Sequence, residues 1–278
     1  MSTALAIARA VGRQAIGDLR PVLLGSGILS ILASAGVFVL VGALGHKPLE
    51  GTALPFGAVM AAGAVGAISG FIPLQIGGEA YTDRIGGALV RVRVLPHGPL
   101  VWALGKLVTA LVQTFLIQGA ILIGVILAVR SLPISASQVL ICLLLLVLGA
   151  AASAPLGFLI AAASRGVSSM MLSFLGMSAL VLTGGFVFPL PEMPTWLQAI
   201  QQALPTYWAG HLSRWALVGD PVWEIGGAFH PVLAVCVLIA WAVIGFACAP
   251  FIVRSSFRKE SLGNLARMQS KLRSQQGL

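Results

Sequence analysis

Six long stretches of the chain are almost free of charged side chains, and no other feature restricts the fold as strongly. They cover residues 22–44, 54–76, 100–129, 136–163, 167–187 and 231–253. A helix that crosses the hydrocarbon core of a bilayer needs about 20 mostly apolar residues, and each stretch is long enough. We therefore predict an all-α, polytopic membrane protein with six transmembrane helices, whose transmembrane domain spans residues 22–253.

The composition supports a membrane bundle. Hydrophobic residues make up 58% of the chain and charged residues only 9%, whereas a soluble domain carries about 25% charged residues. The net charge is +9. Because the basic residues flank apolar stretches, membrane lipids with anionic headgroups are expected partners and nucleic acid is not. The three cysteines lie inside apolar stretches without a CxxC spacing, so they predict neither a disulfide framework nor a metal site.

The first 21 residues are predicted to form an amphipathic helix that lies in the membrane interface. Apolar residues recur at three- and four-residue steps, while Gln14, Asp18 and the arginines take the other side. Pro21 is expected to start the first span. No cleavable signal peptide is apparent, because a compact apolar region followed by a small-residue cleavage site is missing.

The placement of lysine and arginine predicts the orientation of the chain. With the N-terminus in the cytoplasm, only Lys47, Arg130 and Arg214 of the 17 basic residues would lie outside. Cytoplasmic loops carry such an excess of Lys and Arg, so both termini are predicted to be cytoplasmic. Residues 254–278 would then form a basic cytoplasmic tail, either a solvated helix or a headgroup-binding segment.

Smaller signals mark two of the spans. Gly66 and Gly70 form a GxxxG pair in the second span, which favours close approach of another helix. Pro155 is expected to kink the fourth span.

The loop between spans two and three combines charge with a helical pattern. Ile85, Ala88, Leu89 and Val92 fall on one helical face, with charged residues on the other. We predict a short amphipathic helix at the cytoplasmic surface, over residues 79–92. It could dock into a groove on a soluble partner or lie against lipid without a partner.

The segment after span five is divided by prolines at positions 189, 191, 194 and 205. Four of the six tryptophans lie between residues 196 and 223, and tryptophan concentrates at membrane–water interfaces. We therefore predict an external re-entrant hairpin of broken helices between spans five and six.

These features, in this order, resemble the permease subunit of type-2 ATP-binding-cassette (ABC-2) exporters, and in particular daunorubicin and multidrug exporters. The strongest local match is the stretch Gly-Gly-Phe-Val-Phe-Pro189-Leu-Pro191-Glu-Met-Pro194-Thr-Trp196-Leu, followed by Leu204-Pro205-Thr-Tyr207. The next is Glu79…Asp83-Arg84…Gly87-Ala-Leu89…Leu95-Pro96. The chain departs from the family at residues 17–21, where an arginine-rich stretch is more usual, and in the extra arginines at 91 and 93.

The resemblance implies a mechanism that depends on other subunits. Such permeases bind no cofactor and are not enzymes; ATP and Mg²⁺ are bound by a separate ABC ATPase subunit, present in two copies. The chain accordingly lacks a GxxxxGK[ST] motif, the usual cradle for ATP phosphates. A second permease, identical or paralogous, would pack against spans one, two and five. Residues 79–92 would be the coupling helix, with Glu79, Asp83, Arg84, Leu89 and Arg91 contacting the ATPase.

The resemblance also assigns roles near span five. The external hairpin would serve as a gate, formed by Phe186, Phe188, Pro189, Pro191, Trp196, Pro205 and Tyr207. Span five would offer side chains to the substrate pathway, namely Met170, Phe174, Met177 and Thr183. An uncharged pathway favours an apolar or amphipathic substrate, such as a drug, an antibiotic or a lipid-like molecule, leaving the cytoplasm or inner leaflet across a bacterial inner membrane.

Two alternatives belong to other classes. A six-span intramembrane protease needs a paired serine and histidine in the membrane, but the four histidines lie at span ends or in loops. A channel or ion-coupled secondary transporter usually carries acids inside its spans, and none of the eight acids lies within a predicted span.

Overall fold

The computed structural model describes residues 3–45, 47–48, 54–128, 134–164 and 166–258, together with residues 263, 266 and 270. The regular elements in this part of the chain are helices, which confirms the all-α prediction there. The N-terminal half contains α1 (Thr3–Leu24), α2 (Ser26–Leu44), α3 (Phe56–Ala67), η1 (Ile68–Phe71), α4 (Ile72–Ile85), α5 (Ala88–Arg93) and α6 (Gly98–Ala128). The C-terminal half contains α7 (Ala136–Ser153), α8 (Leu156–Ala163), α9 (Val167–Leu182), η2 (Leu190–Glu192), α10 (Thr195–Ala203), α11 (Pro205–Leu217), η3 (Ile225–Gly227) and α12 (Pro231–Arg258).

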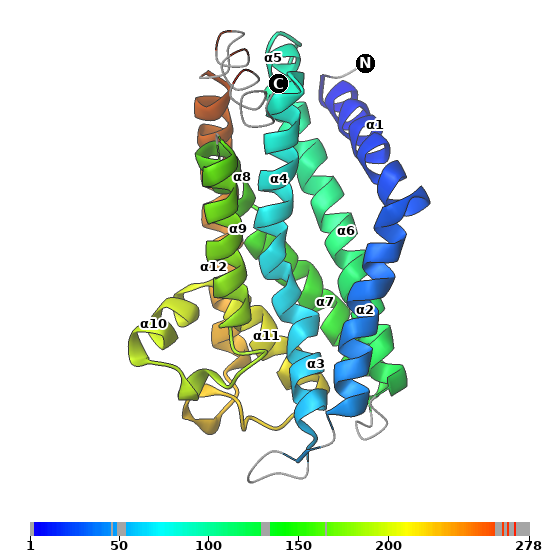
Figure 1. The fold of residues 1–278 in the computed structure, drawn as a ribbon, viewed down its shortest axis with the longest axis vertical. Coiled ribbons are helices and arrows are strands. Elements are labelled where there is room, and N and C mark those ends of the chain that lie inside the picture. Colours follow the sequence, from blue (N-terminus) through cyan, green and yellow to red (C-terminus); the bar gives the residue numbers. More distant parts are fainter. Residues whose placement is uncertain are drawn as a thin grey trace.

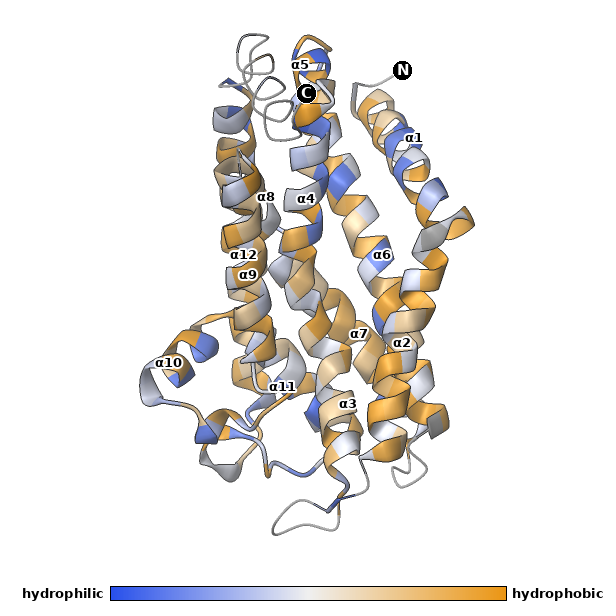
Figure 2. Ribbon diagram, viewed as in Figure 1, coloured by the Kyte–Doolittle hydropathy of each residue, from blue (hydrophilic) through white to orange (hydrophobic). Residues whose placement is uncertain are grey.

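The long helices run side by side along the longest axis of the molecule (Figure 1). The start of α1, the short helix α5 and the end of α12 lie at one end, which we call the basic end because α1, α5 and α12 bring arginines to it. Helices α10 and α11 lie toward the other end, which we call the hairpin end. Hydrophobic residues follow the long helices, and hydrophilic residues concentrate toward the basic end (Figure 2).

In the described part of the chain, five helical segments are long and apolar enough to cross a membrane: Gly27–Leu44, Phe56–Ile85, Gly98–Leu127, Ala136–Ala163 and Pro231–Arg258. They coincide with predicted spans one, two, three, four and six. The predicted fifth span contains α9, which is apolar but has only 16 residues. At 1.5 Å per residue α9 is about 24 Å long, a few ångströms less than a typical hydrocarbon core of about 30 Å. The predicted fifth span, and with it the total of six, therefore stays a prediction.

The boundary between the N-terminal helix and the first span differs from the prediction. Pro21 lies inside α1, and the chain breaks four residues later, at Gly25. The turn is tight, because a Cβ at Gly25 would lie 2.6 Å from the Pro21 carbonyl oxygen. Packing also differs from the prediction: Gln14 and Asp18 face α6 and do not point away from the bundle.

The second and fourth spans are not continuous α-helices. The second span passes through the 3₁₀ turn η1 and continues as α4 to Ile85, so it is longer than predicted and includes Glu79 and Asp83. The predicted boundary at residue 76 had left both acids outside this helix. The fourth span breaks between α7 and α8 at Pro155, which confirms the predicted kink.

Helix α11 crosses α3 at very short range inside the bundle. A Cβ at Gly66 would lie 2.0 Å from the Ala209 carbonyl oxygen, and a Cβ at Gly70 would lie 2.7 Å from Thr206 Oγ1. The Gly66 N–H donates to Ser213 Oγ of α11 at 3.2 Å. The GxxxG pair thus provides the close helix contact that its spacing predicts.

The contact at Gly66 gives a direct test of the packing. We expect Gly66→Ala to destabilise the protein by about 1–3 kcal/mol, because the added methyl group must push α11 away from α3. The measurement is the thermal unfolding midpoint of the detergent-solubilised protein. Gly119→Ala on α6 is the matched control, since a Cβ there meets nothing within 4 Å. Equal stability of the two variants would contradict the close α3–α11 crossing.

Candidate functional site

Helix α5 stands at the basic end of the molecule and is anchored to the bundle by one side chain. Leu89 is only 2% exposed and belongs to a buried cluster with Ile76 and Trp102. Gly87 adopts a left-handed conformation (φ +71°) that turns the chain from α4 into α5, a conformation that glycine tolerates best. The short helix is therefore held against α4 and α6 while its far side remains accessible.

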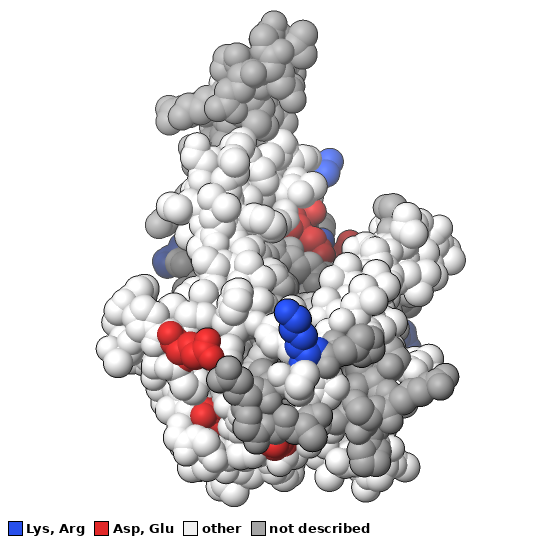
Figure 3. Space-filling model, turned by 60° about the horizontal axis from the view of Figure 1, so that its bottom comes forward, with Lys and Arg blue, Asp and Glu red and all other residues white. Residues whose placement is uncertain are grey.

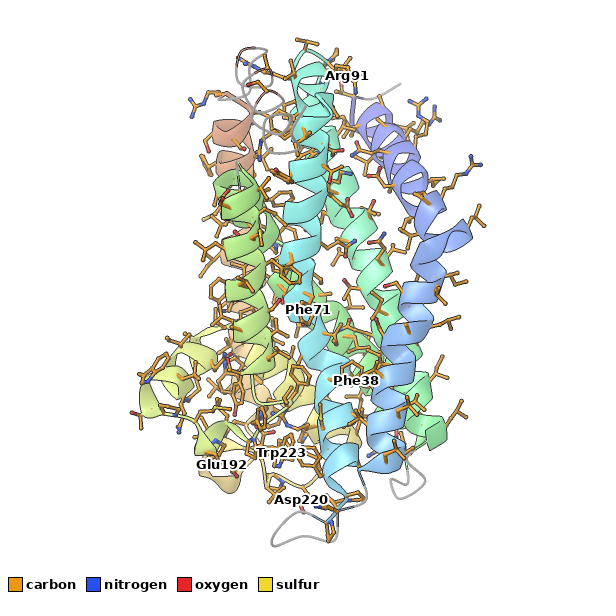
Figure 4. All side chains as sticks on the ribbon, viewed as in Figure 1. Phe38, Phe71, Arg91, Glu192, Asp220 and Trp223 are labelled. Carbon is orange, nitrogen blue, oxygen red and sulfur yellow. The ribbon has the colours of Figure 1, made fainter. Side chains whose placement is uncertain are left out.

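The accessible side of this region mixes basic and apolar residues. Arg91 and Arg93 are exposed, and Arg91 is seen at the tip of α5 in Figure 4. Val94 and Leu95 follow, with 81% and 57% of their surface exposed. A protruding apolar tip with flanking positive charge suits a groove on a partner protein that carries acidic residues.

Three carboxylates from two helices surround one lysine just inside the basic end. Lys106 Nζ on α6 lies 3.0 Å from Asp18 of α1 and 3.1 and 3.2 Å from Glu79 and Asp83 of α4. The Trp102 indole N–H donates to Asp83 Oδ2 at 2.8 Å. We call Asp18, Glu79, Asp83 and Lys106 the lysine cluster. Because its charges are partly shielded from water, their attraction is stronger than that of a surface pair, and it ties α1 and α4 to α6.

Arg84 also forms its hydrogen bonds within the chain. Its side chain is buried, and its guanidinium donates to the carbonyl oxygens of Ser164 at 2.6 Å and Ala161 at 3.0 Å. These carbonyls end α8, where the last turn of a helix has acceptors without intrahelical partners. Arg84 therefore caps α8 and fixes it to α4.

These contacts correct the prediction of a single coupling helix over residues 79–92. Glu79, Asp83 and Arg84 lie on α4, where they contact Lys106 and α8, and only Leu89 and Arg91 of the predicted set lie on α5. The predicted helix is broken at Gly86 and Gly87, and the charged residues before the break face α6 and α8 while Arg91 after it is exposed.

At the hairpin end, α10 and α11 form two helices joined at Leu204, which has an extended backbone. The indole N–H of Trp208 donates to the Gln202 carbonyl at 2.7 Å, and that of Trp241 donates to the Ala203 carbonyl at 2.8 Å. These two bonds satisfy carbonyls at the end of α10. The side chain of Gln201 bonds to Thr183 Oγ1 and to the Leu180 carbonyl, each at 2.8 Å, which ties α10 to the end of α9.

A buried ion pair fastens α11 to the loop that follows it. Arg214 Nε donates to Glu224 Oε1 at 2.6 Å, and Arg214 Nη1 donates to the Gly185 carbonyl at 2.8 Å. Tyr207 donates its hydroxyl proton to Glu224 Oε2 at 3.0 Å. Both charged side chains are only 1% exposed. We call Tyr207, His211, Arg214 and Glu224 the arginine cluster.

The hydrogen bonds of His211 define its tautomer. The backbone N–H of His230 donates to Nε2 at 3.0 Å, so the ring proton is on Nδ1 and is donated to Glu224 at 2.6 Å. Burial alone would raise the pKa of the Glu224 carboxyl. The Arg214 charge and the bond from His211 outweigh burial and lower this pKa from 4.5 to about 2.

The predicted gate residues are split between the interior and the surface of the hairpin end. Phe186 and Tyr207 are each 2% exposed, and Pro205 is buried at the start of α11. Phe188 is 55% exposed and Trp196 on α10 is 64% exposed. Of the two remaining prolines, Pro191 is exposed and Pro189 is half-buried. Trp223 and Asp220 lie near the foot of the molecule in Figure 4, and Figure 3 shows few charged residues among the described atoms of this face.

The four predicted pathway residues do not share one environment. Met170 lies 3.5 Å from where a Cβ of Gly78 would stand. Met177 packs with Phe186 in a buried cluster, and Thr183 is held by Gln201. Phe174 is 55% exposed and belongs to an apolar face of α9 with Met171 and Leu175. A pathway along α9 would therefore involve this face more than Met177 or Thr183.

Sequence reasoning missed the central roles of Lys106, Arg214 and Glu224. Lys106 was counted as a cytoplasmic flanking charge, although its position inside an apolar stretch signals a buried partner. Arg214 and Glu224 lie ten residues apart in a polar segment. Nothing in that spacing predicts their contact.

Long apolar helices, a basic end and a buried polar hairpin define a polytopic membrane protein. Residues 25–218 match the family model described as "ABC-2 type transporter". This match covers more than half of the chain, and the chain therefore belongs to the ABC-2 type transporter family. No curated protein matches the chain. Membership makes it a multi-pass membrane transport protein of a family whose members generally work with an ABC ATPase.

The lysine cluster predicts the behaviour of Lys106 variants. In Lys106→Met, three carboxylates lose the cation that each of them contacts, so we expect α1 to separate from α4 and α6 and stability to fall by about 3–5 kcal/mol. The readout is the rate of trypsin cleavage at the α1 arginines in detergent, which should rise about tenfold. Lys106→Arg keeps the charge and should stay close to the unaltered protein. Unchanged cleavage in Lys106→Met would show that the cluster does not hold α1.

The arginine cluster predicts a dependence of stability on pH. Because the folded-state pKa of Glu224 lies below its unfolded value, its stabilising effect is complete above about pH 4.5 and is lost as the pH falls toward about 2. Glu224→Gln should lower the unfolding midpoint at pH 7, and the gap from the unaltered protein should narrow between pH 4.5 and pH 2. Glu192→Gln, at an exposed site, is the control. A gap that is constant with pH would exclude an ionised Glu224.

Proposed function

We propose that this chain is the permease subunit of an ATP-driven ABC-2 exporter that moves an apolar or amphipathic substrate out of the cytoplasm or inner leaflet. It has six spans, with α9 as the fifth, and both termini lie in the cytoplasm of a bacterial cell. ATP and Mg²⁺ are bound by a separate ATPase subunit in two copies. A second permease, identical or paralogous, completes the membrane part, in the manner of daunorubicin and multidrug exporters.

The observation that carries this proposal is the position of α5, which is buried on one side and exposed at its tip. Its exposed tip, with Arg91 and Val94, is available to a partner, while Leu89 is buried against α4 and α6. Movement of a docked ATPase would therefore pass directly into these two long helices. The lysine cluster and Arg84 extend this connection to α1 and α8.

The distribution of charge supports the cytoplasmic assignment of the basic end. The described arginines of α1, α5 and α12 lie at this end, whereas Lys47 lies at the hairpin end and Arg214 is buried in the arginine cluster. Cytoplasmic ends of spans attract such an excess of positive charge.

The front of the molecule in Figure 1 supports the position of the second permease. Helices α2 and α9 flank the α3–α4 line there, and their contacts agree, since α2 packs on α3 and α9 packs on α4. Their outward residues are large and apolar, including Leu29, Leu32, Leu172 and Leu175. A pathway between two such faces would carry apolar or amphipathic molecules, and the arginine-clamped hairpin would close its outer end.

A second candidate function is supported by one observation. The lysine cluster places ionisable groups within candidate spans, as in ion-coupled secondary transporters. Proteoliposomes that contain this chain alone would decide between the two. Transport driven by a proton gradient without ATPase, and abolished in Lys106→Met, would favour the second candidate.

The main proposal is tested at α5. In Arg91→Glu we expect about tenfold weaker association with the ABC ATPase that co-purifies with the unaltered chain, about 1.4 kcal/mol, because the reversed charge meets an acidic groove. ATP-dependent uptake of an apolar dye into inside-out vesicles should fall in parallel. Lys47→Glu, the same reversal at the hairpin end, is the control and should leave association unchanged. If both variants bind the ATPase equally well, α5 is not its docking site.

A further inference from the structure

An apolar groove opens between α6, α8 and α12 near the basic end. Its volume is about 320 Å³. Most of its lining is apolar, with His97 and Arg254 as the polar members; the apolar side chains include Leu100, Leu104, Leu107, Phe158, Phe246 and Val253. No acidic residue of the described chain lines it.

A second, basic pocket adjoins this groove. It has a volume of about 770 Å³ and shares Pro99 and Arg254 with the groove. It adds Arg93, the last residue of α5, and Arg258 at the end of α12. Three guanidinium groups therefore surround one pocket at the mouth of an apolar groove, and its described lining again contains no acid.

The order of these two pockets follows the polarity of a phospholipid. Along α12 the groove runs from Phe246 to Arg254, which corresponds to about 12 Å of helix at 1.5 Å per residue. The apolar part therefore reaches toward the middle of the membrane, while the arginines stay at its surface. Phe251, beside the pocket, is 74% exposed, as expected for a side chain in contact with lipid.

We propose that this composite site binds one anionic phospholipid of the surrounding leaflet. Arg254 and Arg258 bind the phosphate and the headgroup through charge-assisted hydrogen bonds, with Arg93 completing the basic pocket. One acyl chain lies in the groove between α6 and α12. Basic pockets between membrane helices on the cytoplasmic side recognise anionic headgroups, and the adjoining apolar groove distinguishes a lipid from a free anion.

This site would affect coupling because Arg93 is the last residue of α5, the helix that also carries Arg91. A bound lipid would connect the end of α5 to α12 and so restrict α5 relative to the bundle. The inference uses the proposed orientation only to place the site in the cytoplasmic leaflet. Lipid binding is measured on the chain alone, so its failure is distinguishable from failure of the ATPase proposal.

The test compares defined lipids on the purified full chain. Native mass spectrometry in detergent, with added dioleoyl-phosphatidylglycerol or dioleoyl-phosphatidylcholine, should show one tightly bound phosphatidylglycerol and at least about tenfold weaker phosphatidylcholine. In the double variant Arg254→Gln and Arg258→Gln, phosphatidylglycerol affinity should fall at least about tenfold. The matched control is Arg13→Gln with Arg20→Gln, which removes two exposed arginines from α1 at the same end, and it should keep the bound lipid.

A groove variant and a competitor complete the design. Leu104→Phe narrows the groove and should weaken phosphatidylglycerol binding while the chain elutes normally on size exclusion. Inorganic phosphate should fail to displace the lipid. Three results would each overturn the proposal: equal binding of the two lipids, an equal loss in the α1 control, or displacement by phosphate together with an unaffected Leu104→Phe variant, which would indicate a site for free anions.

Discussion

The close crossing of α11 on α3 is the contact on which the rest of the fold depends. Glycines at 66 and 70 leave no room for side chains, so the backbone of α11 lies directly on that of α3. Helix α11 is buried inside the bundle and carries polar side chains there. Most of these side chains bond within the arginine cluster. The Arg214–Glu224 pair then fixes the following loop and, through Gly185, the segment after α9.

The two polar clusters lie at opposite ends of the molecule and connect different helices. The arginine cluster, at the hairpin end, joins segments that are close in sequence. The lysine cluster, at the basic end, joins α1, α4 and α6, which are distant in sequence. Buried ion pairs add little net stability compared with apolar packing. Their effect here is to fix which helices are held to one another, α1 and α4 to α6 in one case and α11 to its following loop in the other.

Several site residues could be read from the sequence, while others could not. The anchor Leu89 and the exposed Arg91 followed from helical periodicity, and the prolines correctly divided the hairpin. Glu79, Asp83 and Arg84 were assigned to the wrong surface because periodicity shows that charges share a face but does not show what that face contacts. Lys106 lies 23 residues beyond Asp83 in the sequence, and its contacts with Glu79 and Asp83 place the charged face of α4 in the interior of the protein.

The sequence by itself determined that the chain is a helical membrane protein, where most of its long helices lie, and which end carries the positive charge. These properties depend on local hydropathy and on charge that lies close along the chain, so one stretch at a time is sufficient to reveal them. Only the tertiary structure decided that Lys106 has three acidic neighbours, that Arg214 is buried against Glu224, and that arginines of α5 and α12 meet at an apolar groove. These contacts join residues from separate helices, and their partners follow from helix packing, which periodicity within one helix does not specify.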